Sequence, residues 1–271
     1  MTQWIMNARM YAVTPAVEAA WRELLDCVTR EAGVPLEYVP YPAPQPLEEL
    51  WARPDLGAVF MCGFPIALGL AAVEPLAAPI PAVDWAAGRA VYRTDLIVRE
   101  AAPWRRLEDS FGGRAGWTVA HSQSGFNAFR HELLPWRTPA RPTLYAAMSG
   151  NLVTARSVLD AVREGRLDIG PLDAYWHLLI ARHAPELTAG IRVLASTPVT
   201  PMPAFVAARG APADMVASLR DAFTRARTRP WFKPLGEQLL IEGFAPSQPE
   251  DYAMLLDWDR AARTAGYAEP A

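Results

Sequence analysis

Short apolar runs alternate with amphipathic segments along most of the chain. Apolar runs bounded by glycine, proline and small polar residues are typical of β-strands. The runs that predict strands lie at residues 4–11, 36–41, 57–61, 90–98, 115–120, 143–148, 167–173, 191–197 and 204–208. The spacing between most neighbouring runs leaves room for a helix or a turn.

The segments between these runs carry apolar residues at helical spacing. The first begins at Pro15 and ends before Gly33, as expected for a helix with proline in its first turn and glycine after its last. Further helices are predicted over residues 47–51, 126–134, 153–162, 174–182 and 212–227, and a broken helical tail over residues 231–265. Strands alternating with helices predict an α/β fold with helices on the faces of mostly parallel sheets.

The composition indicates a globular protein with a sizeable core. Hydrophobic residues make up 51% of the 271 residues and charged residues 20%, which argues against disorder. This length suffices for one large domain or two lobes. The net charge of -3 gives no basic footprint for nucleic acid. No apolar run reaches the length of about 18 residues that a membrane span requires. We therefore expect neither a nucleic-acid partner nor membrane insertion.

Cysteine and histidine give no sign of a metal site. Two cysteines, Cys27 and Cys62, cannot form a disulfide framework. One bridge between them is possible in principle, but their positions favour two buried thiols. The histidines are His121, His131, His177 and His183. Their spacing matches no metal-binding pattern, so we predict no metal and no cofactor.

The most informative polar segment is residues 121–127, His-Ser-Gln-Ser-Gly-Phe-Asn. It follows an apolar run and precedes a predicted helix. The hydroxyls of Ser122 and Ser124, together with the unpaired amides of a first helical turn, predict a seat for an anion. No phosphate-loop lysine and no Gly-x-Gly-x-x-Gly pattern accompanies it. The alternative interpretation is an ordinary serine-capped helix.

A family resemblance is carried by five patches that occur in a fixed order. They are residues 10–11, 62–65, 92–98, 122–127 and 149–173. With these patches in this order, the chain resembles the phosphate/phosphite/phosphonate-type substrate-binding proteins of ABC transporters, which have the type 2 periplasmic binding fold.

The resemblance implies a two-lobe clamp built on two hinge strands. Lobe I would comprise residues 1–88 plus 198–271 and lobe II residues 89–197, each with a mostly parallel sheet flanked by helices. The hinge strands would lie near residues 88–93 and 196–201. A ligand would bind between the lobes and favour closure through contacts to both.

The resemblance also implies a set of ligand-binding residues. They are Tyr11, Phe64, Tyr92, Ser122, Gln123, Ser124, Gly125, Asn151, Asp173 and Tyr175. The serine hydroxyls match those that hold the ligand's acid group in the family, and Gly125 lets the backbone approach. For the aromatic residues Tyr11, Phe64 and Tyr92 the alternative is core packing. Asp168, by contrast, is predicted to be structural.

One departure from the family bears on the ligand. The family's Ser-Gly-x-His stretch, whose histidine helps to bind a phosphonate, here ends in Leu152. A leucine cannot donate, and a hydrogen bond to a charged group contributes about 1.5–3 kcal/mol. The seat itself also contains no lysine or arginine. We therefore expect a small carboxylate or sulfonate in preference to a phosphonate.

The predicted function is capture of a small anionic ligand for an ABC importer, by a monomer that binds a transporter permease and performs no catalysis. The resemblance implies a periplasmic location. No signal peptide is visible, so either one was removed or the protein is cytoplasmic. The alternatives are a lyase or synthase on the same fold and a cytoplasmic ligand-sensing module. A hydrolase using Ser122 or Ser124 with His121 or His131 is disfavoured, because no Gly-x-Ser-x-Gly turn surrounds either serine.

Overall fold

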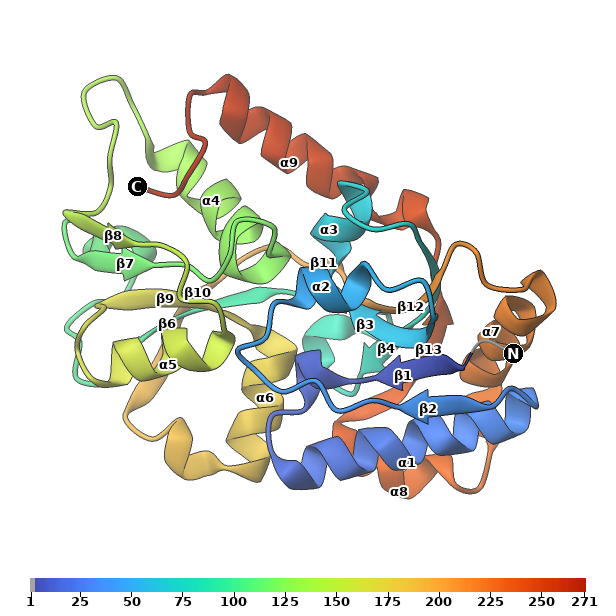
Figure 1. Cartoon of the computed structure of the whole chain (residues 1–271). Helices are drawn as coiled ribbons and strands as arrows, with labels where there is room; N and C mark the ends of the chain where they lie inside the picture. The colour runs from blue at the N-terminus through green and yellow to red at the C-terminus, as the bar shows by residue number, and fades with distance from the viewer. Residues whose placement is uncertain (1–2) are drawn as a thin grey trace. The chain divides into compact units, whose positions relative to one another are not determined.

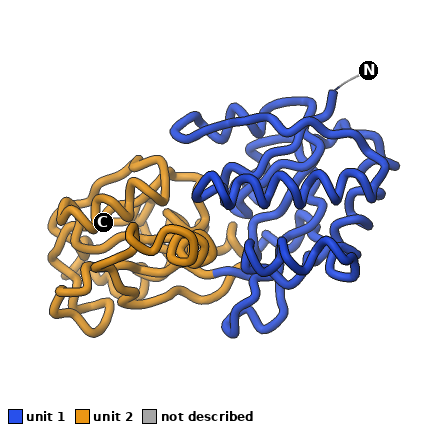
Figure 2. Tube along the Cα trace, turned by 90° about the horizontal axis from the view of Figure 1, so that it is seen from below, with its two compact units in different colours: residues 1–92, 201–253 blue, residues 93–200, 254–271 orange. Residues whose placement is uncertain are grey.

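The computed structural model describes residues 3–271 and divides the chain into two compact units (Figure 2). Unit 1 comprises the described residues up to Tyr92 together with Pro201–Ala253, and unit 2 comprises Arg93–Thr200 and Met254–Ala271. The chain therefore passes between the units at three points. Two of these crossings fall within the segments predicted as hinge strands.

Unit 1 is built on a mixed sheet with strand order β13-β4-β12-β3-β1-β2 (Figure 1). Its strands are β1 (Trp4–Asn7), β2 (Leu36–Tyr38), β3 (Leu56–Met61), β4 (Val73–Pro81), β12 (Ala204–Ala208) and β13 (Ile241–Pro246). β1 pairs in parallel with β2 and β3, whereas β12 pairs antiparallel with β3 and β4. The helices are α1 (Pro15–Ala32), α2 (Leu47–Trp51), α3 (Gly63–Ala67), α7 (Ala213–Arg225) and α8 (Phe232–Leu239).

An aromatic cluster fastens the helices of unit 1 to its sheet. Phe205 of β12 stacks on Phe60 of β3 with ring centroids 3.7 Å apart. Trp21 of α1 meets Phe60 edge-on at 5.1 Å, and Phe223 of α7 stacks on Phe205 at 4.9 Å. All four side chains are buried. Since aromatic pairs combine a large buried area with a preferred geometry, this cluster fixes α1 and α7 on the sheet.

Unit 2 has a second mixed sheet with strand order β10-β6-β9-β7-β8. Its strands are β6 (Thr94–Arg99), β7 (Arg114–Gly116), β8 (Ala147–Ser149), β9 (Ile169–Asp173) and β10 (Ile191–Ser196). β6 runs antiparallel to β9 and β10, while β7 runs parallel to β8 and β9. The helices are a π-helix (Gln123–Asn127), α4 (Ala128–Leu133), α5 (Ala155–Arg163), α6 (Ala174–His183) and α9 (Ala253–Thr264).

Short elements complete the chain. The strands β5 (Val91–Tyr92) and β11 (Thr200–Pro201) pair with each other, and the second crossing falls inside β11. The 3-10 turns are Arg9–Tyr11, Asp84–Ala86, Leu107–Ser110, Leu134–Trp136, Pro185–Leu187, Ala226–Thr228 and Pro249–Tyr252.

The predicted α/β architecture is confirmed, with sheets that are mixed rather than mostly parallel. α1 has the predicted limits, because Thr14 caps it and Gly33 ends it at a φ of 68°. The predicted helical tail is wrong at β13, which lies at the edge of the sheet beside β4. The strand predicted over 143–148 is also wrong for its first part, since β8 begins at Ala147.

The division into units differs from the predicted lobes at the C-terminus. Residues 254–271 were predicted in lobe I but belong to unit 2, because Ala262 and Tyr267 are buried in one cluster with Phe129 and Leu133. The crossings lie after Tyr92 and after Thr200, a few residues beyond the predicted boundaries at 88 and 197. The predicted lobe I begins at residues 1–2, which lie outside the described residues.

Replacing Phe205 by Ala tests the aromatic cluster. The ring is fully buried between two others, so its removal leaves a cavity and should lower the free energy of unfolding by about 3–5 kcal/mol. Urea denaturation followed by circular dichroism measures this change. Leu70→Ala is the control, because this side chain is 50% exposed and its loss should cost less than about 0.5 kcal/mol. Equal losses in the two variants would contradict the assignment.

Candidate functional site

Ser122 begins the polar turn of unit 2 as a helix cap. Its backbone is extended, with φ −73° and ψ 131°, and its Oγ accepts a hydrogen bond of 3.0 Å from the amide of Gly125. Its carbonyl accepts from the amide of Asn127 at 3.0 Å, within the π-helix. The capping alternative is thus present in the structure. It does not exclude an anion seat, because a hydroxyl that accepts through a lone pair retains its hydrogen for donation.

Gly125 is required by a close approach to Thr118. A Cβ atom at position 125 would lie 2.0 Å from Oγ1 of Thr118, far inside van der Waals contact. Thr118 is 6% exposed, and its hydroxyl oxygen is buried without a hydrogen-bond partner among residues 3–271. The sequence gives no signal for this group, because a threonine inside an apolar run is typical of a strand. Only the packing against Gly125 brings it to the turn.

Gln123 is fully buried, and its side chain takes part in a network inside unit 2. Its Oε1 accepts a hydrogen bond of 2.9 Å from Nδ2 of Asn127. Asn127 in turn accepts from Arg130 at 3.0 Å, and Arg130 is also paired with Asp259 of α9. The guanidinium lies 4.9 Å from the ring centroid of Phe126. This network fastens the π-helix to α9, which lies beside α4 in Figure 1.

The remaining turn of the predicted seat, at the end of β8, has mixed exposure. Asn151 is exposed and adopts a left-handed backbone with φ 54°. Gly150 before it packs against the indole of Trp117, where a Cβ would lie 2.4 Å from a ring carbon. Leu152 packs against the core cluster that contains Val158. The residue that replaces the family's histidine is therefore half-buried against the hydrophobic core.

Asp173 and Tyr175 lie at the junction of β9 and α6. Oδ1 of Asp173 accepts hydrogen bonds from the amides of Tyr175 at 2.9 Å and Trp176 at 3.0 Å, so the carboxylate caps α6. Tyr175 is fully buried, and burial, with a further contribution from the charge of Asp173, raises the pKa of its phenol well above the ordinary value. Its hydroxyl stays protonated at neutral pH.

The three predicted aromatic residues of unit 1 are all buried, at 1–2% exposure. Tyr11 meets Phe60 edge-on at 5.1 Å. The hydroxyl of Tyr92 lies 3.8 Å from Sγ of Cys62, at the N-terminal end of the short helix that carries Phe64. These contacts are those expected for core packing, the alternative interpretation given for the three residues.

Both cysteines are buried free thiols, which confirms the prediction made from their positions. Among the residues that the structure describes, no group of His, Cys, Asp or Glu is arranged to hold a metal ion. The described helices include none that is long and apolar enough to span a membrane. His131 stacks on Trp258 with ring centroids 4.0 Å apart, and burial lowers its pKa. This stacking places the ring against α9.

Asp168 is structural, as predicted. Its carboxylate accepts hydrogen bonds from the side chains of Arg114 and Arg99, and from the Arg114 amide. The hydrogen bonds from Arg114, followed by that from Arg99, lower the pKa of Asp168 to about 2 although burial opposes this. The three residues join β6, β7 and the start of β9.

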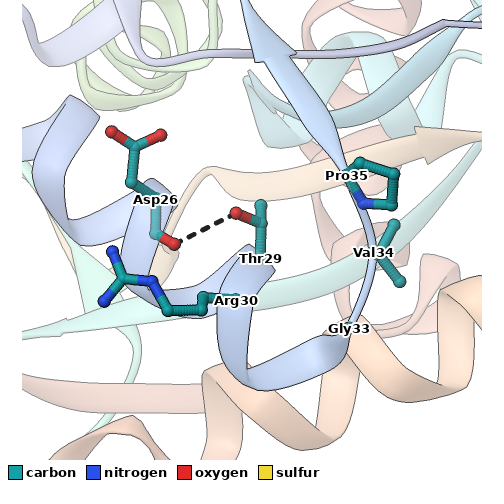
Figure 3. Close-up of a pocket in the computed structure, with 6 residues that line it drawn as sticks. All are labelled: Asp26, Thr29, Arg30, Gly33, Val34 and Pro35. Atoms are coloured by element: carbon teal, nitrogen blue, oxygen red, sulfur yellow. Dashed lines mark hydrogen bonds between the residues drawn. The ribbon is translucent and has the colours of Figure 1, made fainter.

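Two of the cavities among the described residues are lined by unit 1, and neither of these two contains a predicted ligand-binding residue. The larger, of about 490 Å³, is an open depression at the end of α1 lined by Asp26, Thr29, Arg30, Gly33, Val34 and Pro35. Figure 3 shows the Thr29 hydroxyl turned back to the carbonyl of Asp26, to which it donates. The smaller, of about 250 Å³, is lined mainly by apolar residues that include Val91, Pro201 and Tyr252.

Comparison with known proteins gives a consistent result. Residues 12–252 match the family described as ABC transporter, phosphonate, periplasmic substrate-binding protein. No curated protein matches the sequence significantly.

Solved structures share the fold over nearly the whole chain. The binding-protein component of an ABC phosphonate transporter from Pseudomonas aeruginosa has a TM-score of 0.79 at 16% identity, over 97% of this chain and 88% of that one. PhnD1 from Prochlorococcus marinus, in complex with methylphosphonate, has a TM-score of 0.77 at 12% identity, over 98% and 99%. Rpa4515 from R. palustris, with adipate, has a TM-score of 0.66 at 14% identity, over 99% and 98%. At these identities the likeness shows the two-lobe type 2 fold.

Replacing Asp168 by Asn tests its structural role through pH. A carboxyl whose pKa is lowered on folding from 3.8 to about 2 contributes about 2 kcal/mol of stability at pH 7. This contribution is present above the unfolded pKa and is lost as pH falls through the folded value. Urea denaturation should therefore show a wild-type advantage of about 2 kcal/mol at pH 7 that narrows between pH 4 and pH 2. An advantage that stays constant across this range would contradict the ion-pair assignment.

Proposed function

Since this chain belongs to the periplasmic substrate-binding proteins of phosphonate-type ABC transporters and is by that membership a solute-binding protein, we propose that its solute is a small organic acid, which it delivers to a transporter permease. The observation that carries the proposal is the family match over residues 12–252, joined to a serine-capped polar turn within the matched region. The protein acts as a monomer in the periplasm, the compartment named in the family's description.

In this proposal Ser122, Ser124 and the amides near Gly125 bind the acid group. Two features support it: Ser122 caps the turn, and the buried hydroxyl of Thr118 packs against Gly125 of the same turn. Hydroxyl and amide donors at a positive helix end are suited to a carboxylate or sulfonate.

The other predicted residues complete the proposed set. Tyr11, Phe64 and Tyr92 contact the organic part of the ligand, and Asn151 contributes its amide. Asp173 and Tyr175 face the ligand's far end. Gln123 contributes through its amide nitrogen, because its carbonyl oxygen already accepts from Asn127.

The preference for a monoanionic acid group follows from the surroundings of the seat. Leu152 packs against the core and offers no donor, and Arg130 is paired with Asp259. A phosphonate carries more negative charge than a carboxylate and gains more from each additional donor. Among proteins of this fold, one is described with methylphosphonate and another with adipate, so the scaffold accommodates both acid classes.

The protein binds this ligand without changing it chemically. His131, one of the two bases that a hydrolase would use, is held against Trp258. The carboxylate of Asp168 is committed to two arginines. A binder needs only convergent donors and a matching shape, and the proposal assigns the donors to the turn.

Replacing Ser122 and Ser124 together by Ala tests the seat. Loss of two hydrogen bonds to a charged group should weaken binding by about 1–3 kcal/mol, measured by calorimetric titration with the tightest-binding acid. Because Ser122 also caps the π-helix, the titration is performed well below the melting temperature of the variant. Ser218→Ala in α7 of unit 1 is the matched control and should bind as the wild type does. Unchanged affinity in the double variant would refute the assignment.

A thermal-shift screen tests the ligand class. Adipate and methanesulfonate should raise the melting temperature more than methylphosphonate at equal concentration, because a ligand that binds only the native state stabilises it by mass action. A strong shift with methylphosphonate and none with the other two would overturn the preference. Recovery of a chemically altered ligand after incubation would overturn the assignment as a binding protein.

A further inference from the structure

Thr94 joins the polar turn to the second strand that leaves unit 2. Its amide donates to Oγ1 of Thr197 at 3.0 Å, and its carbonyl accepts from the amide of Thr197 at 3.0 Å. Its own hydroxyl donates to the carbonyl of Ser124 at 3.1 Å. Thr94 is 1% exposed and Thr197 5%. Thr94 therefore bonds to Thr197 through its backbone amide and carbonyl, and to the turn at Ser124 through its hydroxyl.

These two threonines lie beside the crossings between the units. Thr94 is the second residue of unit 2 after the crossing at Tyr92, and Thr197 lies three residues before the crossing at Thr200. The hydroxyl of Thr197 also donates to the carbonyl of Pro198 at 3.1 Å. The strands by which the chain enters and leaves unit 2 are therefore bonded to each other and, through Thr94, to Ser124.

The third crossing is bonded to the same turn from its other side. Nδ2 of Asn127 donates to the carbonyl of Leu255 at 3.0 Å as well as to Gln123. Leu255 is the second residue of unit 2 after the crossing at Ala253. Near each of the three crossings, one residue is thus connected to the turn that carries Ser122 and Ser124. Thr94 and Leu255 bond to the turn directly, and Thr197 does so through Thr94.

This arrangement needs a side-chain hydroxyl at position 94. Valine has the same shape and suits a strand equally well, but it cannot donate to the Ser124 carbonyl. Because the site is buried, loss of that donor leaves the Ser124 carbonyl without a hydrogen-bond partner, and water cannot readily take the donor's place. The hydroxyl is therefore the specific feature that links the turn to the strand.

We propose that Thr94 and Thr197 are positioning residues that couple the turn at Ser122–Asn127 to the strands entering and leaving unit 2. A ligand held by the turn then changes the stability of the chain crossings through the Ser124–Thr94–Thr197 hydrogen bonds. The inference rests on the proposed function for its ligand, but the coupling itself exists in the ligand-free protein. Coupling of this kind requires direct evidence that a change at one site alters the other.

Hydrogen exchange of the ligand-free protein provides that evidence. Thr94→Val should raise the exchange rates of amides in residues 122–127 and 196–200 together by about tenfold, the effect of losing one buried hydrogen bond. Thr94→Ser keeps the hydroxyl and should restore both segments. Thr188→Val is the matched control, because it removes a hydroxyl that donates to a backbone carbonyl at the same distance of 3.1 Å, elsewhere in unit 2.

Other outcomes overturn the inference. If exchange rises uniformly across unit 2, or only around residue 94, the hydroxyl serves general or local stability alone. Should Thr94→Val fail to fold, Thr197→Val tests the same connection from the far end. It should raise exchange in residues 122–127, with Thr197→Ser as its rescue, and an unchanged turn would refute the coupling.

Exchange measured with added ligand separates this inference from the proposed function. Saturating adipate should slow exchange in residues 122–127 and 196–200 of the wild type. In Thr94→Val adipate should still slow exchange at the turn. At residues 196–200 the slowing by adipate should be smaller than in the wild type by at least about threefold. If adipate, methanesulfonate and methylphosphonate all leave the wild type unshifted in melting temperature, the proposed function fails, while the ligand-free exchange still decides the coupling.

Discussion

A polar turn inside a hydrophobic unit must have its hydrogen-bonding groups paired, and this requirement organises unit 2. Residues 123–127 are all buried, so donors and acceptors there that lack partners would each cost on the order of 1–3 kcal/mol. Partners come from three directions: the Ser122 cap, Thr94 of β6, and Leu255 of α9. The hydrogen bond to Leu255 explains why residues 254–271 belong to unit 2, although residues 201–253 before them belong to unit 1.

Unit 1 reaches its stability in a different way, through aromatic packing. The stacked rings of Phe60, Phe205 and Phe223 bind strand to strand and helix to sheet without any polar requirement. The predicted ligand residues of this unit are embedded in the same kind of surroundings, as the contact of Tyr11 with Phe60 illustrates. Unit 2 thus contains a buried polar network around its turn, whereas unit 1 contains a buried aromatic cluster.

The sequence predicts features that depend on local signals and misses those that depend on distant packing. Pro15 and Gly33 define α1 because capping is a property of a few neighbouring residues. β4 lies between β13 and β12 although it contains Pro75, Pro79 and Pro81, residues that normally argue against an inner strand. Its pairing with both neighbours has irregular register, and no local pattern foretells this arrangement.

The candidate site shows the same limit. A serine followed by a small polar run predicts a capped turn, and the structure has one. The inward orientation of the Gln123 side-chain oxygen depends on its hydrogen bond from Asn127. The burial of the Thr118 hydroxyl depends on Gly125, against which the threonine side chain packs. These are contacts between side chains whose geometry is set by the π-helix, a form that sequence periodicity does not distinguish from an α-helix.

Electrostatics connects the buried network to the choice of ligand. Arg130 follows the π-helix closely and is fully buried, so it is the cation best placed to influence the turn. Although burial opposes ionisation, hydrogen bonds from Arg130 and Arg263 hold the pKa of Asp259 below its ordinary value, and the carboxylate remains charged at neutral pH. The charge of Arg130 is thereby compensated within unit 2. In the proposed seat an anion would therefore meet neutral donors and the partial charge of a helix end, a combination that favours a single negative charge over two.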